Sequence, residues 1–103
     1  MECRIAQNQL MEILAVWNQF LKRRVHLIAC GGTAITLQGI KNTTKDVDFM
    51  VPREAEYEYL IKTLQQLGYQ PRTGAGWKKP NDPYIFDLYR GNKIHTTELL
   101  ESP

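Results

Sequence analysis

One hexapeptide decides how the chain folds: Asp46-Val47-Asp48-Phe49-Met50-Val51. Acidic and apolar side chains alternate at its start, which is the pattern of a strand with one buried face. Because neighbouring strand side chains point to opposite faces and rise about 3.3 Å each, Asp46 and Asp48 share a face, with Cα atoms roughly 6.5 Å apart. Val47, Phe49 and Val51 share the other face, which a covering helix would bury. The stretch therefore predicts a strand with an acidic side and an apolar side.

A glycine pair stands upstream of this strand. Residues 25–30 are almost continuously apolar and stop at Gly31-Gly32, which is typical of a buried strand that ends in a tight turn. A short helix over residues 33–38, closed by Gly39, is expected after the turn. The polar residues 41–45 then form a loop that leads into the acidic strand.

Two longer amphipathic helices are expected to cover the sheet. Residues 5–21 carry apolar side chains at helical spacing. The core-facing stripe of this helix is Leu10, Leu14, Trp17 and Leu21, with Ile13 and Phe20 beside it. A later helix begins with Pro52 as its first residue and has Gly68 as its C-cap. Its side chains directed toward the core are Tyr57, Leu60, Ile61, Leu64 and Leu67.

Two further strands are expected over residues 69–72 and 84–89. The loop between them, residues 73–83, contains two glycines and two prolines, and the strands can pair as an irregular hairpin. The element order is then helix, strand, helix, strand, helix, strand, strand. This order predicts an α/β (α+β) fold, with a mixed β-sheet covered by helices, in a single domain over residues 1–103.

Composition sets broad limits on the class of protein. The chain has 103 residues, 43% of them hydrophobic and 23% charged, as in a globular domain and unlike a disordered chain. Its 13 basic and 11 acidic residues give a net charge of +2, a balance too even to argue for nucleic-acid binding. Cys3 and Cys30 form no CxxC pair, and no uninterrupted apolar stretch predicts a signal peptide or a membrane span. We therefore expect a cytoplasmic protein with no membrane partner.

The glycine turn and the acidic pair point to phosphate and metal chemistry. Gly31-Gly32-Thr33 lies where a strand feeds a helix, so backbone N–H groups and the positive end of the helix dipole favour a phosphate there. Thr33 can offer its hydroxyl to that phosphate or cap the helix. Asp46 and Asp48 repel each other unless a cation neutralises them, and hard carboxylate oxygens suit Mg²⁺ or Mn²⁺.

A third carboxylate, Asp87, stands between Phe86 and Leu88 in an apolar strand, where an unpaired charge would be costly. The same metal site can be its partner. In a two-metal scheme the ions bridge the triphosphate, and Asp87 would bind beside the acceptor hydroxyl and help to take its proton.

In the order and context of these elements, the sequence resembles the polymerase-β-like nucleotidyltransferases, especially small bacterial members from toxin–antitoxin and phage-defence loci. Their pattern is a hydrophobic residue with Gly and then Gly or Ser, an Asp-x-Asp pair about a dozen residues later, and a third Asp on a later strand. The matching segments are Cys30-Gly31-Gly32, Thr44-Lys45-Asp46-Val47-Asp48 and Phe86-Asp87-Leu88. The resemblance spans roughly residues 25–90.

The resemblance implies a minimal nucleotidyltransferase fold that moves a nucleoside monophosphate from ATP or another nucleoside triphosphate to an acceptor. The implied cofactor is Mg²⁺ (or Mn²⁺). The implied catalytic and metal-binding residues are Asp46, Asp48 and Asp87, and the implied nucleotide-binding residues are Gly31, Gly32 and Thr33. The acceptor is left open among RNA, protein and a small molecule.

Members of this superfamily usually continue into further helices beyond the third carboxylate. We therefore expect a domain truncated at its C-terminus, a minimal enzyme, or a domain completed by a protein partner or as a homo-oligomer. The alternative function is a non-catalytic nucleotide- or partner-binding module of the same fold, such as an antitoxin-like protein.

Each acidic or glycine feature also has a plainer interpretation. Asp46 and Asp48 can be surface carboxylates on an edge strand, and the glycines can form only a tight turn. Asp87 can form a structural salt bridge with Arg72 or Arg90.

Other residues are expected to be structural. The basic cluster Lys22-Arg23-Arg24 suits the C-terminal end of the first helix better than it suits a phosphate-binding patch. His26 and His95 lack the spacing of metal ligands. Trp77 is expected to fold back onto the core rather than to stack on a base.

Overall fold

The computed structural model describes residues 3–91 and 100–102 of the chain. This part contains three helices and eight strands. In chain order they are β1 (Ile5–Ala6), α1 (Gln7–Phe20), β2 (Leu27–Ala29), α2 (Gly31–Leu37), β3 (Thr43–Thr44), β4 (Val47–Val51), α3 (Glu54–Gln66), β5 (Gln70–Pro71), β6 (Gly76–Lys78), β7 (Ile85–Arg90) and β8 (Leu100–Ser102).

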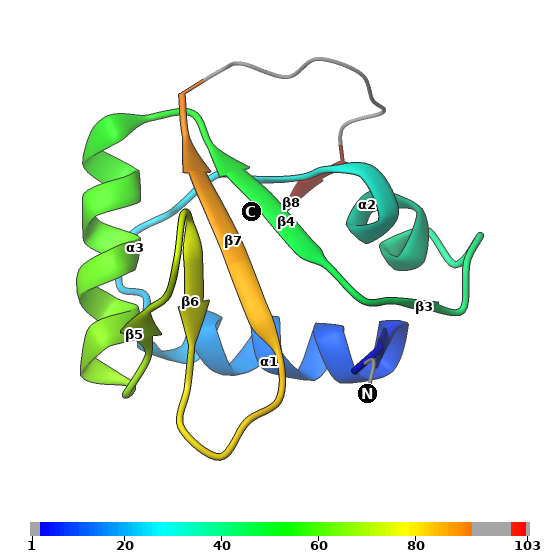
Figure 1. The fold of residues 1–103 in the computed structure, drawn as a ribbon. Coiled ribbons are helices and arrows are strands. Elements are labelled where there is room, and N and C mark those ends of the chain that lie inside the picture. Colours follow the sequence, from blue (N-terminus) through cyan, green and yellow to red (C-terminus); the bar gives the residue numbers. More distant parts are fainter. Residues whose placement is uncertain (1–2, 92–99, 103) are drawn as a thin grey trace.

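The strands form two sheets (Figure 1). The larger has the strand order β5-β6-β7-β4-β2-β8, and the smaller pairs β1 with β3. Strands β4 and β7 run parallel, whereas the other neighbours in the large sheet are antiparallel. The fold is therefore α+β with a mixed sheet, as the sequence predicts. Because β4 has a hydrogen-bonded neighbour on each side, the acidic stretch does not lie on an edge strand.

One face of the large sheet packs against α1 and α3 (Figure 1). The apolar side of β4 is fully buried there, as the alternation in residues 46–51 predicts. Each large apolar side chain buried in this way contributes about 1.5–3 kcal/mol of transfer free energy. The side chains at the centre of this core are Leu10, Trp17, Val47, Phe49, Val51, Leu60, Leu64, Phe86 and Leu88.

Three aromatic rings fix α1 on the sheet. Trp17 of α1 lies edge-on to Tyr69 and Phe86, with centroid separations of 5.8 and 5.0 Å. The indole Nε1–H of Trp17 also donates a hydrogen bond of 3.1 Å to the Tyr69 hydroxyl. Edge-to-face pairs add about 0.5–1.5 kcal/mol beyond the area that they bury. The docking of α1 therefore depends on this contact as well as on its apolar stripe.

Some helix boundaries differ from the predicted ones. Helix α1 begins at Gln7 because Ile5 and Ala6 pair with β3 instead. Phe20 is 52% exposed, so its predicted place beside the core stripe is wrong; it is the last residue of α1, and no further turn shields it. Pro52 is not the first residue of α3, which has Arg53 as its N-cap.

The segment predicted as a loop over residues 73–83 contains a strand. In this strand, β6, Trp77 stands opposite Phe86 of β7 and is buried, as expected for folding back onto the core. The predicted hairpin between the strands at 69–72 and 84–89 is therefore wrong, because β6 lies between β5 and β7 (Figure 1). The turn-forming glycines and prolines on both sides obscure so short a strand in the sequence.

Candidate functional site

Two carboxylates from distant parts of the chain meet on the sheet. Asp48 of β4 and Asp87 of β7 are direct Cα partners in the parallel pair. Both project from the face opposite the core, since Val47 and Phe49 on one strand and Phe86 on the other are buried against the helices. The carboxyl groups are close enough for Asp48 in its protonated form to donate a hydrogen bond to Asp87. The structure therefore places Asp87 beside Asp48, as expected from the sequence.

The acid pair is electrostatically strained. The pKa of Asp48 rises from its ordinary 3.8 to about 6, first because of burial, then because of the hydrogen bond to Asp87 and the negative charges of Asp87 and Asp46. Burial followed by the charge of Asp48 also raises the pKa of the Cys30 thiol. Burial and then the charges of Asp87 and Asp48 raise the pKa of Tyr89. The negative charges on this face therefore help to raise the pKa values of the groups around them.

Asp46 lies at the margin of the pair. It directly precedes β4, which starts at Val47, and its side chain is exposed. Its backbone carbonyl accepts hydrogen bonds from the hydroxyls of Thr33 at 3.2 Å and Thr44 at 3.0 Å. Its side chain and that of Asp87 line a common cavity of about 540 Å³. Asp46 is thus anchored by its backbone and near the pair, with its carboxylate in solvent.

The glycine turn is joined directly to the acidic strand. Helix α2 begins at Gly31, which has a φ of +53°, and its N-cap is Cys30, whose backbone N–H donates to the carbonyl of Asp48 at 3.1 Å. A Cβ on Gly32 would lie 2.8 Å from the hydroxyl oxygen of Thr44. Glycine at position 32 is therefore required by close approach to the segment that leads into the acidic strand.

Thr33 has a role that differs from the predicted one. Its side chain is fully buried, and its hydroxyl donates to the carbonyl of Asp46 while accepting a hydrogen bond of 2.8 Å from the backbone N–H of Asp48. It is not the cap of α2, and its hydroxyl is already committed inside the protein, so a phosphate would not reach it. Thr33 instead positions the acidic strand relative to the turn.

The donor set of the acid pair is suited to a hard divalent cation. Asp48 and Asp87 offer carboxylate oxygens side by side, and the raised pKa of Asp48 reflects a negative charge that a cation would neutralise. Among residues 3–91 and 100–102, no group of three or more His, Cys, Asp or Glu side chains is arranged to hold a metal ion. Mg²⁺ in nucleotide sites commonly takes one or two carboxylates and completes its shell with water and phosphate oxygens. The pair fits that requirement, and a centre of three carboxylates with Asp46 stays a prediction.

Asp87 has no structural salt bridge within the described segments. Arg90 pairs with Glu54 at 2.9 Å and places its guanidinium 4.5 Å from the ring centroid of Tyr57. Arg72 lines the same cavity as Asp87 but forms no ion pair with a described residue. The plainer interpretation of Asp87 as half of a salt bridge with either arginine is therefore wrong for this part of the chain.

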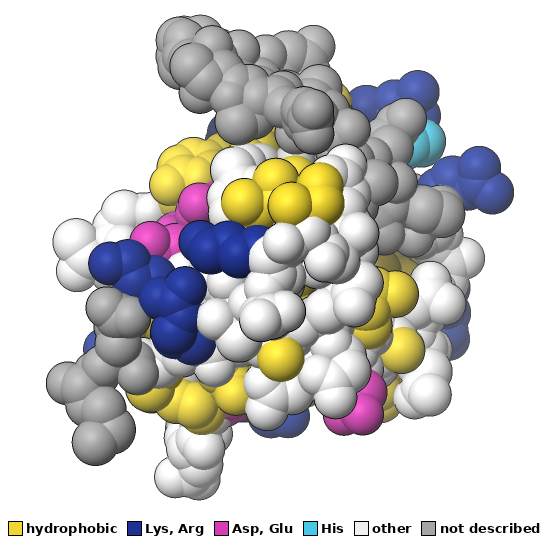
Figure 2. Space-filling view, turned by 90° about the vertical axis from the view of Figure 1, so that its right-hand side faces the viewer, with side chains coloured by type: hydrophobic (Ala, Val, Ile, Leu, Met, Phe, Trp, Pro, Cys, Tyr) yellow, Lys and Arg dark blue, Asp and Glu magenta, His cyan; other side chains and the backbone are white. Residues whose placement is uncertain are grey.

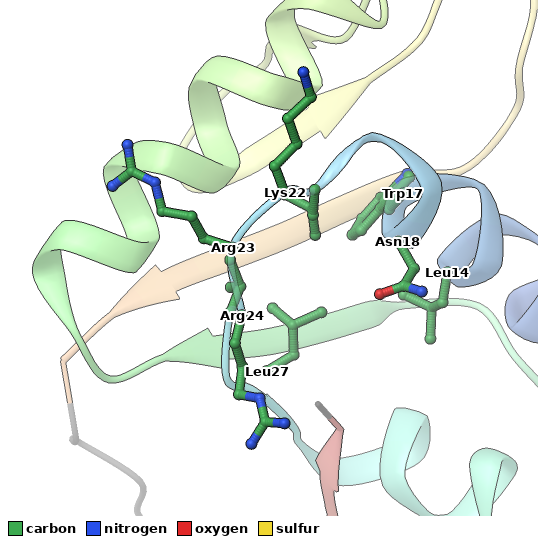
Figure 3. Close-up of a pocket in the computed structure, with 9 residues that line it drawn as sticks. Leu14, Trp17, Asn18, Lys22, Arg23, Arg24 and Leu27 are labelled. Atoms are coloured by element: carbon green, nitrogen blue, oxygen red, sulfur yellow. The ribbon is translucent and has the colours of Figure 1, made fainter.

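The basic cluster Lys22-Arg23-Arg24 borders a separate cavity of about 430 Å³ beside Trp17 (Figure 3). Its three side chains point in different directions and do not converge on one point (Figure 3). The Arg23 guanidinium lies 4.9 Å from the ring centroid of Tyr59, whose hydroxyl accepts a hydrogen bond from the backbone N–H of Lys22 at 2.6 Å. These contacts support a structural role for the cluster.

His26 is also engaged structurally. Its backbone N–H donates to Glu56 at 2.7 Å, and its ring Nδ1 lies 3.1 Å from the same carboxylate. Although burial acts to raise the pKa of Glu56, the hydrogen bonds from His26 and then from Arg53 lower it overall. His95 lies outside the described residues.

Basic side chains lie directly beside acidic ones on the side of the molecule that carries α2 (Figure 2). Two positions near the candidate site have roles that the sequence does not indicate: Thr44 approaches the glycine turn closely, and Gly76 stands opposite Asp87. Thr44 is a short polar residue in a predicted loop, and Gly76 resembles an ordinary turn glycine. The close approach of Gly32 to Thr44 and the pairing of β6 with β7 reveal these roles.

No family model, curated protein or solved structure matches the chain. Within the described residues, none of the helices has the length and apolar character needed to cross a membrane.

Proposed function

We propose that this protein is a nucleotidyltransferase, which moves a nucleoside monophosphate from a nucleoside triphosphate to an acceptor hydroxyl. The observation that supports this most is the register match of Asp48 and Asp87 beside the turn at Gly31 and Gly32. Two half-buried carboxylates side by side, with no basic partner among the described residues, oppose folding, so a functional reason for keeping them is favoured.

In this proposal Asp48 and Asp87, with Asp46 next to them, hold Mg²⁺ or Mn²⁺, which supplies charge neutralisation for the triphosphate. Backbone N–H groups at Gly31 and Gly32 lie in the first turn of α2, where they have no partner within the helix, and they donate to phosphate oxygens. The buried hydroxyl of Thr33 keeps the two parts of the site in register.

The proposed reaction breaks one bond and forms one. The acceptor oxygen bonds to the α-phosphorus, while the bond from that phosphorus to the oxygen bridging to the β-phosphorus breaks. Pyrophosphate leaves with the electron pair of that bond. Asp87 accepts the proton of the acceptor hydroxyl and passes it to water.

Thermal unfolding with nucleotide tests the binding step. Millimolar ATP with Mg²⁺ should raise the Tm by several degrees, since a ligand at about 100 times its Kd stabilises by about 2.7 kcal/mol. Asp48→Asn should abolish the increase. Glu12→Gln, which removes one exposed negative charge from α1, should preserve it. An unchanged Tm for the wild type with each of ATP, GTP, CTP and UTP would contradict the proposal.

Label position tests the chemical step. Incubation with α-labelled triphosphate and a cell lysate should label an acceptor that the Asp48→Asn variant leaves unlabelled. The γ-labelled triphosphate should give no label that depends on Asp48, because only the nucleoside monophosphate is transferred. Binding of nucleotide and Mg²⁺ with no labelled acceptor would favour the non-catalytic binding module instead. Labelling that depends on Asp48 from the γ position but not from the α position would indicate phosphoryl transfer and reject nucleotidyl transfer.

A further inference from the structure

Four residues form a row across the open face of the sheet. Asp48 is the Cα partner of Asp87, and Asp87 is in turn the partner of Gly76 on β6. The backbone N–H of Arg72, just after β5, donates to the carbonyl of Gly76 at 2.8 Å. Because residues directly opposite each other share a face, the acid pair continues through a glycine to an arginine.

Because Gly76 has no side chain, the side chains around it can approach one another above the sheet. A Cβ at this position would lie 3.0 Å from Cγ2 of Ile85, 3.3 Å from Oδ1 of Asp87 and 3.4 Å from Cβ of Arg72. The backbone at Gly76 does not need glycine, since its φ is not in the left-handed region. Space is therefore the reason for glycine here, and it brings the Asp87 carboxylate and the stem of Arg72 together.

A cavity of about 540 Å³ lies over the end of the row formed by Asp87 and Arg72. Its lining includes two carboxylates, Asp46 and Asp87, and two cationic side chains, Lys45 and Arg72, with Tyr84 beside them. The volume is in the range of sites for small molecules. Arg72 forms no ion pair or hydrogen bond through its guanidinium with the described residues, although two carboxylates line the same cavity.

An arginine that borders an acidic site without pairing to it is available to an anionic group of a ligand. Its planar guanidinium matches phosphate oxygens in a bidentate manner. Asp87, at the other side of Gly76, is the carboxylate proposed to take a proton from a hydroxyl. The cavity thus offers a proton acceptor and an anion-binding group that are separated by one strand.

We propose that this cavity receives the acceptor of the transfer and that the acceptor carries a phosphate, which Arg72 binds while a hydroxyl of the same molecule lies at Asp87. The inference rests on the proposed nucleotidyltransferase function and adds the chemical class of its second substrate. The new bond joins the acceptor hydroxyl oxygen to the α-phosphorus with release of pyrophosphate, and the acceptor's own phosphate is unchanged.

Amide-resolved NMR titration without nucleotide or metal tests the inference. Ribose 5-phosphate should shift the amide signals of Thr73, Gly76 and Ile85, whereas ribose should not. Arg72→Gln should weaken this binding at least about tenfold, since it removes a charge-assisted contact. Arg24→Gln removes another exposed arginine, one that lines the cavity beside Trp17, and should leave the binding unchanged. The dispersion of the spectra reports directly whether each variant is folded.

A second probe identifies the source of the phosphate. Tighter binding of a short single-stranded RNA at the same amides would support an RNA end as the acceptor, and binding of ribose 5-phosphate alone would support a small phosphorylated acceptor. Equal affinity of wild type and Arg72→Gln, or shifts only elsewhere, would overturn the inference. A titration with ATP and Mg²⁺ separates the two proposals. If ATP does not bind, the transferase proposal is rejected. If ATP binds but the binding of ribose 5-phosphate does not depend on Arg72, only the acceptor assignment is rejected.

Discussion

Asp48 and Asp87 stand directly opposite each other on the parallel strands β4 and β7, and each bears a carboxyl group on the face away from the core. Such a pair opposes folding unless a proton or a cation neutralises part of its charge. A protein under selection for stability alone would replace one of the two, so the pair is a place where function and stability conflict.

Asp48→Asn should increase the free energy of unfolding of the metal-free protein at about pH 8 by about 1 kcal/mol. Asparagine keeps the shape of the side chain and a hydrogen-bond donor toward Asp87 but carries no charge. The difference between a pKa of about 6 and the ordinary 3.8 corresponds to at most about 3 kcal/mol, and exposure of the carboxyl to water reduces this.

Urea unfolding measures the difference, with Glu12→Gln as the exposed control that should change stability by less than about 0.5 kcal/mol. A marked loss of stability in Asp48→Asn would show that the carboxylate supports the fold, and the conflict would not exist.

The stability of the metal-free wild type should fall by about 1 kcal/mol relative to Asp48→Asn between about pH 4 and pH 7. The pKa of Asp48 is higher in the folded state, about 6, than its ordinary 3.8, so the folded protein holds the proton more tightly. The stabilisation is complete below the lower value and is lost as the pH rises through the higher one. Parallel pH profiles for the two proteins would contradict the raised pKa.

Substoichiometric Mn²⁺ should broaden the amide signals of residues 46–48 and of Asp87 before any others, because relaxation by the paramagnetic ion acts at short range. Asp48→Asn and Asp87→Asn should each abolish the selective broadening, since both carboxylates belong to the pair. Asp46→Asn distinguishes a centre of two carboxylates from one of three: only in the second case does the broadening disappear. Uniform weak broadening in the wild type would count against a metal site.

The strand and helix pattern of the sequence predicts the central elements of the fold well. The alternation over residues 46–51 places Val47 and Phe49 in the core and Asp48 on the other face, because a period of two leaves no other arrangement on a half-buried strand. Register between distant strands is not encoded locally. The sequence therefore predicts that Asp87 meets the acidic strand, but only the parallel pairing of β4 and β7 gives its register opposite Asp48.

Apart from helix ends, the errors concern short elements and side chains with two chemically reasonable partners. Strand β6 has three residues, too few for periodicity to stand out among turn-forming neighbours. The hydroxyl of Thr33 suits a phosphate or a backbone group equally well, and only the packing of α2 against β4 shows that the backbone of the acidic strand is its partner.

Thr33→Val should destabilise the protein by about 1–3 kcal/mol, because it leaves the partly buried N–H of Asp48 without its acceptor. It should also reduce the nucleotide-dependent increase in Tm, since the acidic strand loses its connection to the turn. Thr36→Val is a matched control on the same helix: Thr36 is fully buried, but its hydroxyl has no hydrogen-bond partner among the described residues. That variant should be neutral or stabilising, and equal losses in both variants would show that packing, rather than the hydroxyl of Thr33, is what matters.

Gly32→Ala should cost about 1–3 kcal/mol, because the added methyl group would lie 2.8 Å from the Thr44 hydroxyl oxygen and force the segment before the acidic strand to move.

In a Thr44→Ala background the same change should cost at least about 1 kcal/mol less, since the atom that it meets is gone, and a double-mutant cycle measures this coupling. Gly31→Ala provides the contrast. Nothing lies within 4 Å of a Cβ there, but the φ of +53° is unfavourable for alanine, so its cost should be the same with or without Thr44. A coupling to Thr44 at position 32 but not at 31 would show that the turn and the acidic strand are held together by side-chain contact. Absence of coupling at both positions would mean that the two parts of the candidate site are positioned independently.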